Sequence, residues 1–244
     1  MYLIKDFLNS KDIYFSKEKQ KKIHYNQVHQ RDIINHLKLL ANFHKRVSEN
    51  KEIILLNTSS EIGKQYESYK VSLKKFKKNY LKIKELEEKN IFLETVIKHG
   101  EKVIEYGTQA ISKINYEDYI SLIKRSMKNN EICLGNPFLE NIYGHEKIYI
   151  NDIENLSFNL VESDIINFIN RLIKKRVIMN LDYIIEFYLN EMNLNEKSKE
   201  YIISMTKFPI EVIKIFDRKM YNKKEWSDEE ASKKFVLAIK KIII

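Results

Sequence analysis

The 24 residues from Glu131 to Glu154 read EICLGNPFLENIYGHEKIYINDIE and interrupt a chain that otherwise has helical periodicity. The apolar run Glu131–Leu134 predicts a brief strand. Ile142-Tyr143 and Lys147–Ile150 flank Gly144-His145, and two short β-prone runs around a glycine turn predict a small β-hairpin. A strand, a loop and a hairpin therefore form an irregular insertion between rigid helices, which is where functional sites tend to lie.

On both sides of this segment, apolar residues recur at helical spacing. Ser163-Asp164 is typical of a helix start, so Asp164 is predicted to cap the helix that follows. Residues 65–89 predict a long exposed helix, basic at first and acidic later. His44 falls on an apolar face and is predicted to be buried and hydrogen-bonded rather than a ligand. The predicted stripes are Ile33, Leu37, Leu40, Ala41 and His44; Phe92, Val96, His99, Val103, Tyr106 and Ala110; Ile165, Phe168, Ile169 and Leu172; and Leu181, Ile184, Ile185, Tyr188, Leu189 and Met192. The expected fold is mainly α with a small β-hairpin, of the α+β class.

The composition excludes several classes of protein. A chain of 244 residues with 43% hydrophobic residues can bury a sizeable core in one or two domains. Its five glycines never lie closer than seven residues apart, which excludes a glycine-rich phosphate loop. A single cysteine, Cys133, excludes a disulfide framework and is predicted to be inert. We expect no membrane span, because no apolar run reaches about 18 residues, and Lys5 and Asp6 make the N-terminus a poor signal peptide.

The charge is strongly positive, at +9, but only six of the 43 basic residues are arginine. Arginine is the preferred residue for bidentate contacts with phosphates and bases. We therefore do not expect nucleic-acid binding. The lysine-rich helix at 65–89 has two open interpretations, a solvated surface or a docking face for an acidic partner.

The interrupting segment resembles the catalytic loop of the aminoglycoside/choline-kinase-like phosphotransferases. That loop reads His-(Gly or Asn)-Asp, four residues, then Asn, and the matching stretch here runs from Leu134 through Asn136 to Asn141. Ile150–Glu154 is similar to the metal-binding segment, which is Ile-Asp-Phe-Asp in the nearest relatives. Asp164 matches a later Asp-Leu-Ala position that steadies the catalytic loop in that superfamily.

The likeness extends to the CotS-like spore-coat subgroup and covers nearly the whole chain. Leu40–His44 resembles a Leu-Ala-x-Phe-His motif, Lys74–Lys89 resembles a lysine-rich linker helix, and Phe208-Pro209 with Tyr221–Trp226 resembles the ending of that subgroup. The resemblance implies the C-terminal large lobe of a kinase-like phosphotransferase. It also implies spore coat proteins as partners, and a location in the mother-cell cytoplasm or the spore coat.

Departures from the pattern imply lost catalysis. The position of the general base is Asn136, whose carboxamide cannot accept a proton at neutral pH. Such a base is worth roughly 10²- to 10⁴-fold in rate. Asn141, Asp152 and Glu154 hold the positions of the metal and nucleotide ligands, so the resemblance leaves open Mg-ATP binding, although we expect no cofactor. Asn141 and Asp152 as hydrogen-bonding anchors of the hairpin, and Glu154 as a solvated residue, are the structural alternatives.

The start of the chain implies either an N-terminal truncation of the protein or a misplaced start codon, and the sequence leaves both open. Tyr2–Phe7 resembles the last strand of the small N-lobe, so residues 1–12 are expected to be a remnant of that strand and the hinge, and residues 13–244 the helical large lobe. The expected function is a non-catalytic, pseudokinase-type CotS-like spore coat protein that acts through protein binding in coat assembly. The alternative is an active ATP-dependent small-molecule phosphotransferase whose N-lobe is missing from this chain.

Overall fold

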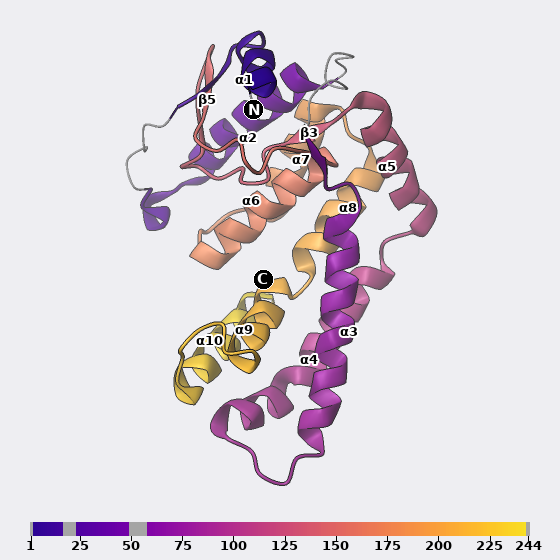
Figure 1. The fold of residues 1–244 in the computed structure, drawn as a ribbon, viewed down its shortest axis with the longest axis vertical. Coiled ribbons are helices and arrows are strands. Elements are labelled where there is room, and N and C mark those ends of the chain that lie inside the picture. Colours follow the sequence, from indigo (N-terminus) through magenta and orange to yellow (C-terminus); the bar gives the residue numbers. More distant parts are fainter. Residues whose placement is uncertain (1, 17–22, 49–57, 243–244) are drawn as a thin grey trace. The chain divides into compact units, whose positions relative to one another are not determined.

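The computed structural model describes residues 2–16, 23–48 and 58–242. The chain divides into two compact units, which are described separately below. Unit 1 comprises Met1–Lys64 and Asn115–Ile203, and unit 2 comprises Gln65–Ile114 and Ser204–Ile244. The fold is mainly helical with two small sheets, which confirms the expected class (Figure 1). The division into a hinge remnant and a lobe at residues 12 and 13 stays a prediction.

Helices make up most of both units. Unit 1 contains α1 (Tyr2–Asn9), the 3-10 helix η1 (Tyr25–Gln27), α2 (Gln30–Val47), α5 (Tyr116–Asn129), α6 (Val161–Lys175) and α7 (Leu181–Met192). Unit 2 contains α3 (Lys64–Lys84), α4 (Ile91–Ser112), α9 (Ile210–Met220) and α10 (Asp228–Ile242). The boundary after Ile203 falls within α8 (Glu196–Lys207). Among the described residues, no helix has the length and apolar character needed to cross a membrane.

The predicted hairpin is confirmed. Strands β4 (Ile142–Gly144) and β5 (Ile148–Ile150) pair antiparallel, with Tyr143 opposite Tyr149. Gly144 has φ of +111°, and a Cβ there would collide with the Lys147 carbonyl oxygen, so the turn requires glycine. Strand β1 (Ile13–Phe15) joins β5 in parallel. A second sheet has the order β2-β6-β3, from Ser59–Ser60, Ser157–Phe158 and the predicted strand at Ile132–Cys133.

The strand expected at the N-terminus is wrong, because Tyr2–Asn9 forms helix α1. Phe7 and Leu8 are adjacent, and both are buried. A half-buried strand would turn these neighbours to opposite faces, whereas a helix can bury both on one broad side. The extended segment begins later, at Ile13 in β1, whose side chain is fully buried.

The core of unit 1 follows the predicted stripes. All four α6 positions expected to be internal, from Ile165 to Leu172, are fully buried, and Ile184, Ile185, Tyr188 and Leu189 form the buried face of α7. Helix α6, however, begins at Val161 with Leu160 as its N-cap residue. The predicted cap at Asp164 is therefore wrong, since Asp164 lies inside the helix. Its carboxylate accepts hydrogen bonds from the backbone of Leu134 and Gly135 instead.

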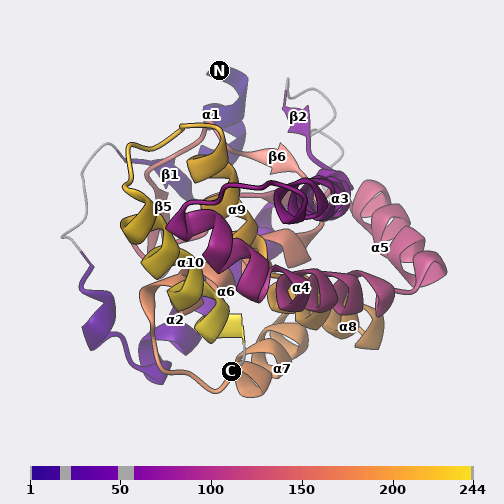
Figure 2. The same cartoon turned by 90° about the horizontal axis from the view of Figure 1, so that it is seen from below.

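Unit 2 surrounds a cluster of aromatic rings. Phe76 of α3, Phe92 of α4, Phe216 of α9 and Phe235 of α10 are buried, with ring centroids 4.9 to 6.5 Å apart in the paired contacts. Helix α10 packs on α4 and α9 (Figure 2). The expectation of a long exposed helix over residues 65–89 is wrong in two respects. One face of α3 is buried, and the helix ends at Lys84.

The buried face of α4 differs from the predicted stripe. His99 and Tyr106 are partly exposed, and the buried positions beside them are Gly100 and Gly107. Each glycine receives a large side chain from α3. A Cβ on Gly100 would lie 2.6 Å from Cδ2 of Tyr80. A hydrophobic pattern cannot reveal this packing, because glycine adds no apolar side chain to the stripe.

Gly100→Ala is expected to destabilise unit 2 by about 1 kcal/mol. Alanine favours a helix by about 1 kcal/mol, but overpacking a close contact costs about 1–3 kcal/mol. Trp226, the single tryptophan, lies in unit 2, so its fluorescence in a urea titration measures the loss. Adding Tyr80→Val should relieve the collision, so the double variant should lose less than the sum of the single losses. Additive losses would contradict the contact.

Candidate functional site

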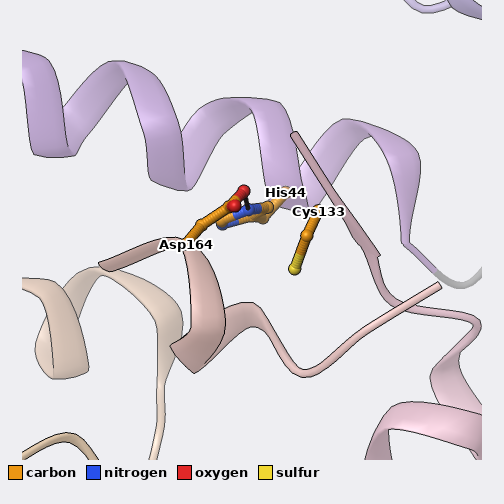
Figure 3. Close-up of side chains that lie close together, drawn as sticks. All are labelled: His44, Cys133 and Asp164. Atoms are coloured by element: carbon orange, nitrogen blue, oxygen red, sulfur yellow. Dashed lines mark hydrogen bonds and ion pairs between the residues drawn. The ribbon is translucent and has the colours of Figure 1, made fainter. Parts of the chain in front are cut away.

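The start of the loop after β3 is hydrogen-bonded to the carboxylate of Asp164, a fully buried residue near the start of α6. Asp164 accepts hydrogen bonds from the backbone N–H groups of Leu134 (2.7 Å) and Gly135 (2.9 Å). Its Oδ2 also lies 3.0 Å from Nε2 of His44 on α2, as Figure 3 shows. One side chain therefore fixes the loop backbone to two helices.

His44 continues this network into α7. Its Nδ1 lies 2.8 Å from the hydroxyl of Tyr188, which donates to the Val161 carbonyl at 3.3 Å. Burial raises the pKa of Tyr188 well above its ordinary value, so the hydroxyl keeps its proton. His44 is fully buried with both ring nitrogens hydrogen-bonded, which confirms its predicted structural character.

Cys133 lies next to the same pair, and potential ligand atoms of His44, Cys133 and Asp164 all lie within 4.8 Å of one another (Figure 3). Each of them already has a hydrogen-bond partner, and the Cys133 thiol donates to the Leu160 carbonyl at 3.1 Å. Burial raises the pKa of this thiol well above its usual range, so without a metal the thiol is protonated. The three side chains pack together under the loop, and each is held there by its own hydrogen bonds.

A second buried network braces β3 and α6. Arg125 of α5 makes paired hydrogen bonds to Glu131 (2.8 and 3.0 Å) and to Glu162 (2.8 and 2.7 Å), and one to Ser198. Burial alone would raise the pKa of Glu162, but the Arg125 guanidinium outweighs burial and lowers that pKa. Arg125 therefore links Glu131, just before β3, to Glu162 at the start of α6, and so connects the two segments that flank the loop.

The far end of the loop is fixed at Glu140. Its carboxylate accepts from the hydroxyl of Tyr25 (2.6 Å) and from Arg171 (2.8 Å), and its backbone carbonyl accepts from Asn151 (2.9 Å). Burial, and then the Glu140 carboxylate, raise the pKa of Tyr25 to about 12. His36 on α2 contacts the Pro137 carbonyl at 2.9 Å, and burial lowers its pKa to about 4, so it stays neutral.

The predicted site residues gather around Asp152, which is partly buried after the hairpin. Its Oδ2 accepts from the side-chain amides of Asn136 (2.7 Å) and Asn155 (2.6 Å), and its Oδ1 accepts from the backbone N–H of Glu154 (2.8 Å). Asn141 donates to the Asn136 carbonyl at 3.1 Å. Burial would raise the pKa of Asp152, but these hydrogen bonds, led by that from Asn136, lower it.

Known proteins are similar to this chain in sequence or in fold. No family model matches the chain. Spore coat protein S of Bacillus subtilis (strain 168) is 22% identical over 177 residues, which cover 70% of this chain and 50% of that protein. The aminoglycoside phosphotransferase of Alicyclobacillus acidocaldarius subsp. acidocaldarius DSM 446 superposes with a TM-score of 0.70 at 12% identity. The chain is therefore similar in sequence to spore coat protein S, and it has the fold of the aminoglycoside phosphotransferase.

The match to each protein is partial. The chain spans about half the length of spore coat protein S. In the structural match, 90% of the chain is covered, together with 65% of the phosphotransferase. The TM-score of this match confirms the expected fold.

Three of the four expected site residues come together. Asn136, Asn141 and Asp152 are linked by hydrogen bonds, whereas Glu154 contributes its backbone N–H and its side chain is exposed. Sequence reasoning missed Asn155, the second amide on Asp152. The only available signal was its position three residues after Asp152, a spacing that suits a local side-chain contact.

Proposed function

We propose that the chain is a non-catalytic CotS-like spore coat protein that acts by binding other proteins during coat assembly. The observation that carries this proposal is Asn136 at the base position, with its amide bonded to Asp152 at 2.7 Å. A carboxamide has no proton-accepting role at neutral pH, and a positioned base is worth roughly 10²- to 10⁴-fold in rate. The loop thus resembles the catalytic loop of the phosphotransferases but has no proton acceptor at the position of the general base.

The oxygens around Asp152 do not fit Mg²⁺ as they are arranged. Mg²⁺ demands near-ideal octahedral coordination by oxygen at about 2.0–2.1 Å. Two amide N–H groups, from Asn136 and Asn155, occupy Oδ2 of Asp152, and a backbone N–H occupies Oδ1. A cation would have to displace these donors. We therefore propose that the chain needs no metal or nucleotide cofactor.

The proposed location is the spore coat, reached from the mother-cell cytoplasm, with coat proteins as partners. This part of the proposal rests on the likeness to spore coat protein S. A fluorescent fusion produced during sporulation of Bacillus subtilis is expected to encircle the developing spore. A diffuse signal throughout sporulation would contradict the proposed location.

A thermal-shift experiment with ATP and Mg²⁺ tests the loss of nucleotide binding. A ligand at about a hundred times its Kd adds about 2.7 kcal/mol of stability. The wild type and Asp152→Ala are both expected to show no ligand-dependent change in Tm. A Mg²⁺-dependent rise that disappears in Asp152→Ala would overturn the proposal in favour of an active phosphotransferase.

Asn136→Asp tests the role of the Asn136 amide directly. It replaces a hydrogen-bond donor by a second carboxylate beside Asp152, and like charges at such a distance repel. The variant is expected to have a lower Tm than wild type at pH 7, with Mg²⁺ restoring part of the loss. Asn136→Ala removes the amide without adding charge, so its Tm should not respond to Mg²⁺. A Tm of Asn136→Asp that equals wild type would argue against the amide as the group that satisfies Asp152.

A further inference from the structure

Unit 2 contains a basic groove between α3 and α4, outside the site described above. The pocket has a volume of about 360 Å³ and is lined by Lys70, Leu73, Lys74, Lys77, Thr108, Ile111 and Ser112. Leu73 and Ile111 supply an apolar floor, and the three lysines lie on one side of α3 at spacings of four and three residues. No carboxylate is among these lining residues. The groove therefore suits a small apolar side chain that is flanked by acidic groups.

The positive charge of this groove is largely unneutralised. Helix α3 carries eight lysines and one glutamate over 21 residues. Lys70 pairs with Glu67 at 3.1 Å. Lys74 and Lys77 form no ion pair with any residue that the structure describes. Two ammonium groups thus flank the apolar floor without a counter-charge from their own chain.

The turn that follows α3 has the complementary character. Its sequence is Glu85-Leu86-Glu87-Glu88, and the side chain of Leu86 is 46% exposed. The Lys89 amine donates to the Leu86 carbonyl, which helps to hold the turn. Within the described part of the chain, none of the three carboxylates forms an ion pair. The exposed leucine can pack on the apolar floor of the groove, and the acidic residues beside it are complementary in charge to the lysines.

The turn cannot reach the groove of its own chain. Helix α3 continues for ten residues after Lys74, and a helix rises about 1.5 Å per residue, so about 15 Å of helix separates Lys74 from the start of the turn. The contacts of Tyr80 with Gly100 and of Leu73 with Gly107 show that α4 runs antiparallel beside α3 (Figure 1). The complementary surface must therefore be on another molecule.

We infer that the acidic turn Glu85–Glu88 of one copy docks into the α3–α4 groove of a second copy, with Leu86 on Leu73 and Ile111. The two surfaces differ, so the contact is head-to-tail, and a docked pair keeps a free groove on one copy and a free turn on the other. Such a contact extends into chains unless the rotation closes a ring. The inference depends on unit 2 alone and stands whether or not the proposed function is correct.

Sedimentation velocity of the full chain tests this docking. The weight-average sedimentation coefficient is expected to rise with protein concentration at low salt and to return to that of the monomer at high salt. Lys74→Glu with Lys77→Glu should weaken self-association about tenfold or more, because exposed pairs become like-charge contacts. Glu85→Lys with Glu87→Lys should have the same effect. Lys78→Glu with Lys82→Glu is the matched control, since both residues are exposed on α3 outside the groove and the change in charge is identical.

A charge swap makes the test decisive. The variant Lys74→Glu with Lys77→Glu has an acidic groove, and the variant Glu85→Lys with Glu87→Lys has a basic turn. When the two variants are mixed, the acidic groove of one can bind the basic turn of the other, so association should return. Unchanged far-UV circular dichroism and Tm would show that each variant is folded. Wild type that stays monomeric at every concentration at low salt would overturn the inference. An equal loss in the Lys78/Lys82 control, or a mixture that stays monomeric, would also overturn it, because general charge attraction would then account for the association.

Discussion

Arg125→Met is expected to lower the free energy of unfolding of unit 1 by about 4 kcal/mol at pH 7. Glu162 is fully buried and Glu131 is 4% exposed, and Arg125 hydrogen-bonds to both carboxylates. Removing one partner of a buried ion pair costs about 3–5 kcal/mol, because the remaining charge has neither water nor a counter-ion. Urea denaturation followed by far-UV circular dichroism measures the loss.

The dependence on pH distinguishes this cause from lost packing. In the wild type the pKa of Glu162 is lowered, so its contribution is present above the ordinary value of 4.5 and is lost as the pH falls through the lowered pKa. Without Arg125, burial raises the pKa of Glu162 above 4.5. The penalty in the variant should then shrink as the pH falls through the raised pKa toward 4.5. A constant difference between the two proteins across this range would contradict the electrostatic cause.

Two further variants control for the size of the effect. Arg125→Met combined with Glu131→Met and Glu162→Met removes every charge of the network, so it should recover much of the lost stability. Lys64→Met breaks an exposed pair with Glu61, in which the lysine side chain is 62% exposed. That variant should unfold as the wild type does, since exposed pairs contribute little.

Asp164→Ala is expected to cost about 4 kcal/mol and to loosen the loop. The change leaves the N–H groups of Leu134, which is buried, and Gly135, which is partly buried, without an acceptor, and each unsatisfied buried group costs about 1–3 kcal/mol. His44 also loses its partner at Nε2. Hydrogen exchange should therefore accelerate at the amides of Leu134 and Gly135, and urea denaturation should give the total loss.

The same variant separates the observed role of Asp164 from that of a helix cap. A lost N-cap costs about 1 kcal/mol and frays the start of its helix. Asp164→Asn keeps one carboxamide oxygen as an acceptor and should lose roughly half as much stability as Asp164→Ala. A loss of 1 kcal/mol or less in Asp164→Ala, with unchanged exchange in the loop, would contradict its role in holding the loop.

Features set by neighbouring residues could be predicted from the sequence. The hairpin follows from Gly144 between two β-prone runs, and α6 follows from a stripe in which every expected position is buried. Two errors have the same origin, since short apolar or polar segments suit more than one structure. Tyr2–Phe7 fits a strand as well as a helix, and Ser163-Asp164 fits a cap although the helix begins at Val161.

The site could be predicted only where it follows a family pattern. Asn136, Asn141 and Asp152 were identified through the resemblance to the phosphotransferase loop, and they do form one hydrogen-bonded group. The supports of that group join distant positions, and no local pattern reveals such pairs. Arg125 meets Glu162 across 37 residues, and Tyr25 meets Glu140 across 115. Each of these residues alone resembles an ordinary surface or core residue.

The single cysteine has a practical consequence. Cys133 is buried directly under the loop, next to Asp164 and His44, and the chain has no other thiol. A thiol reagent can therefore modify the native protein only when this part of unit 1 opens. The rate of thiol modification therefore measures how often this part of unit 1 opens, and the measurement needs no engineered cysteine. For the same reason, a folded copy cannot be cross-linked through sulfur in an oxidising environment, so any covalent attachment must use another side chain.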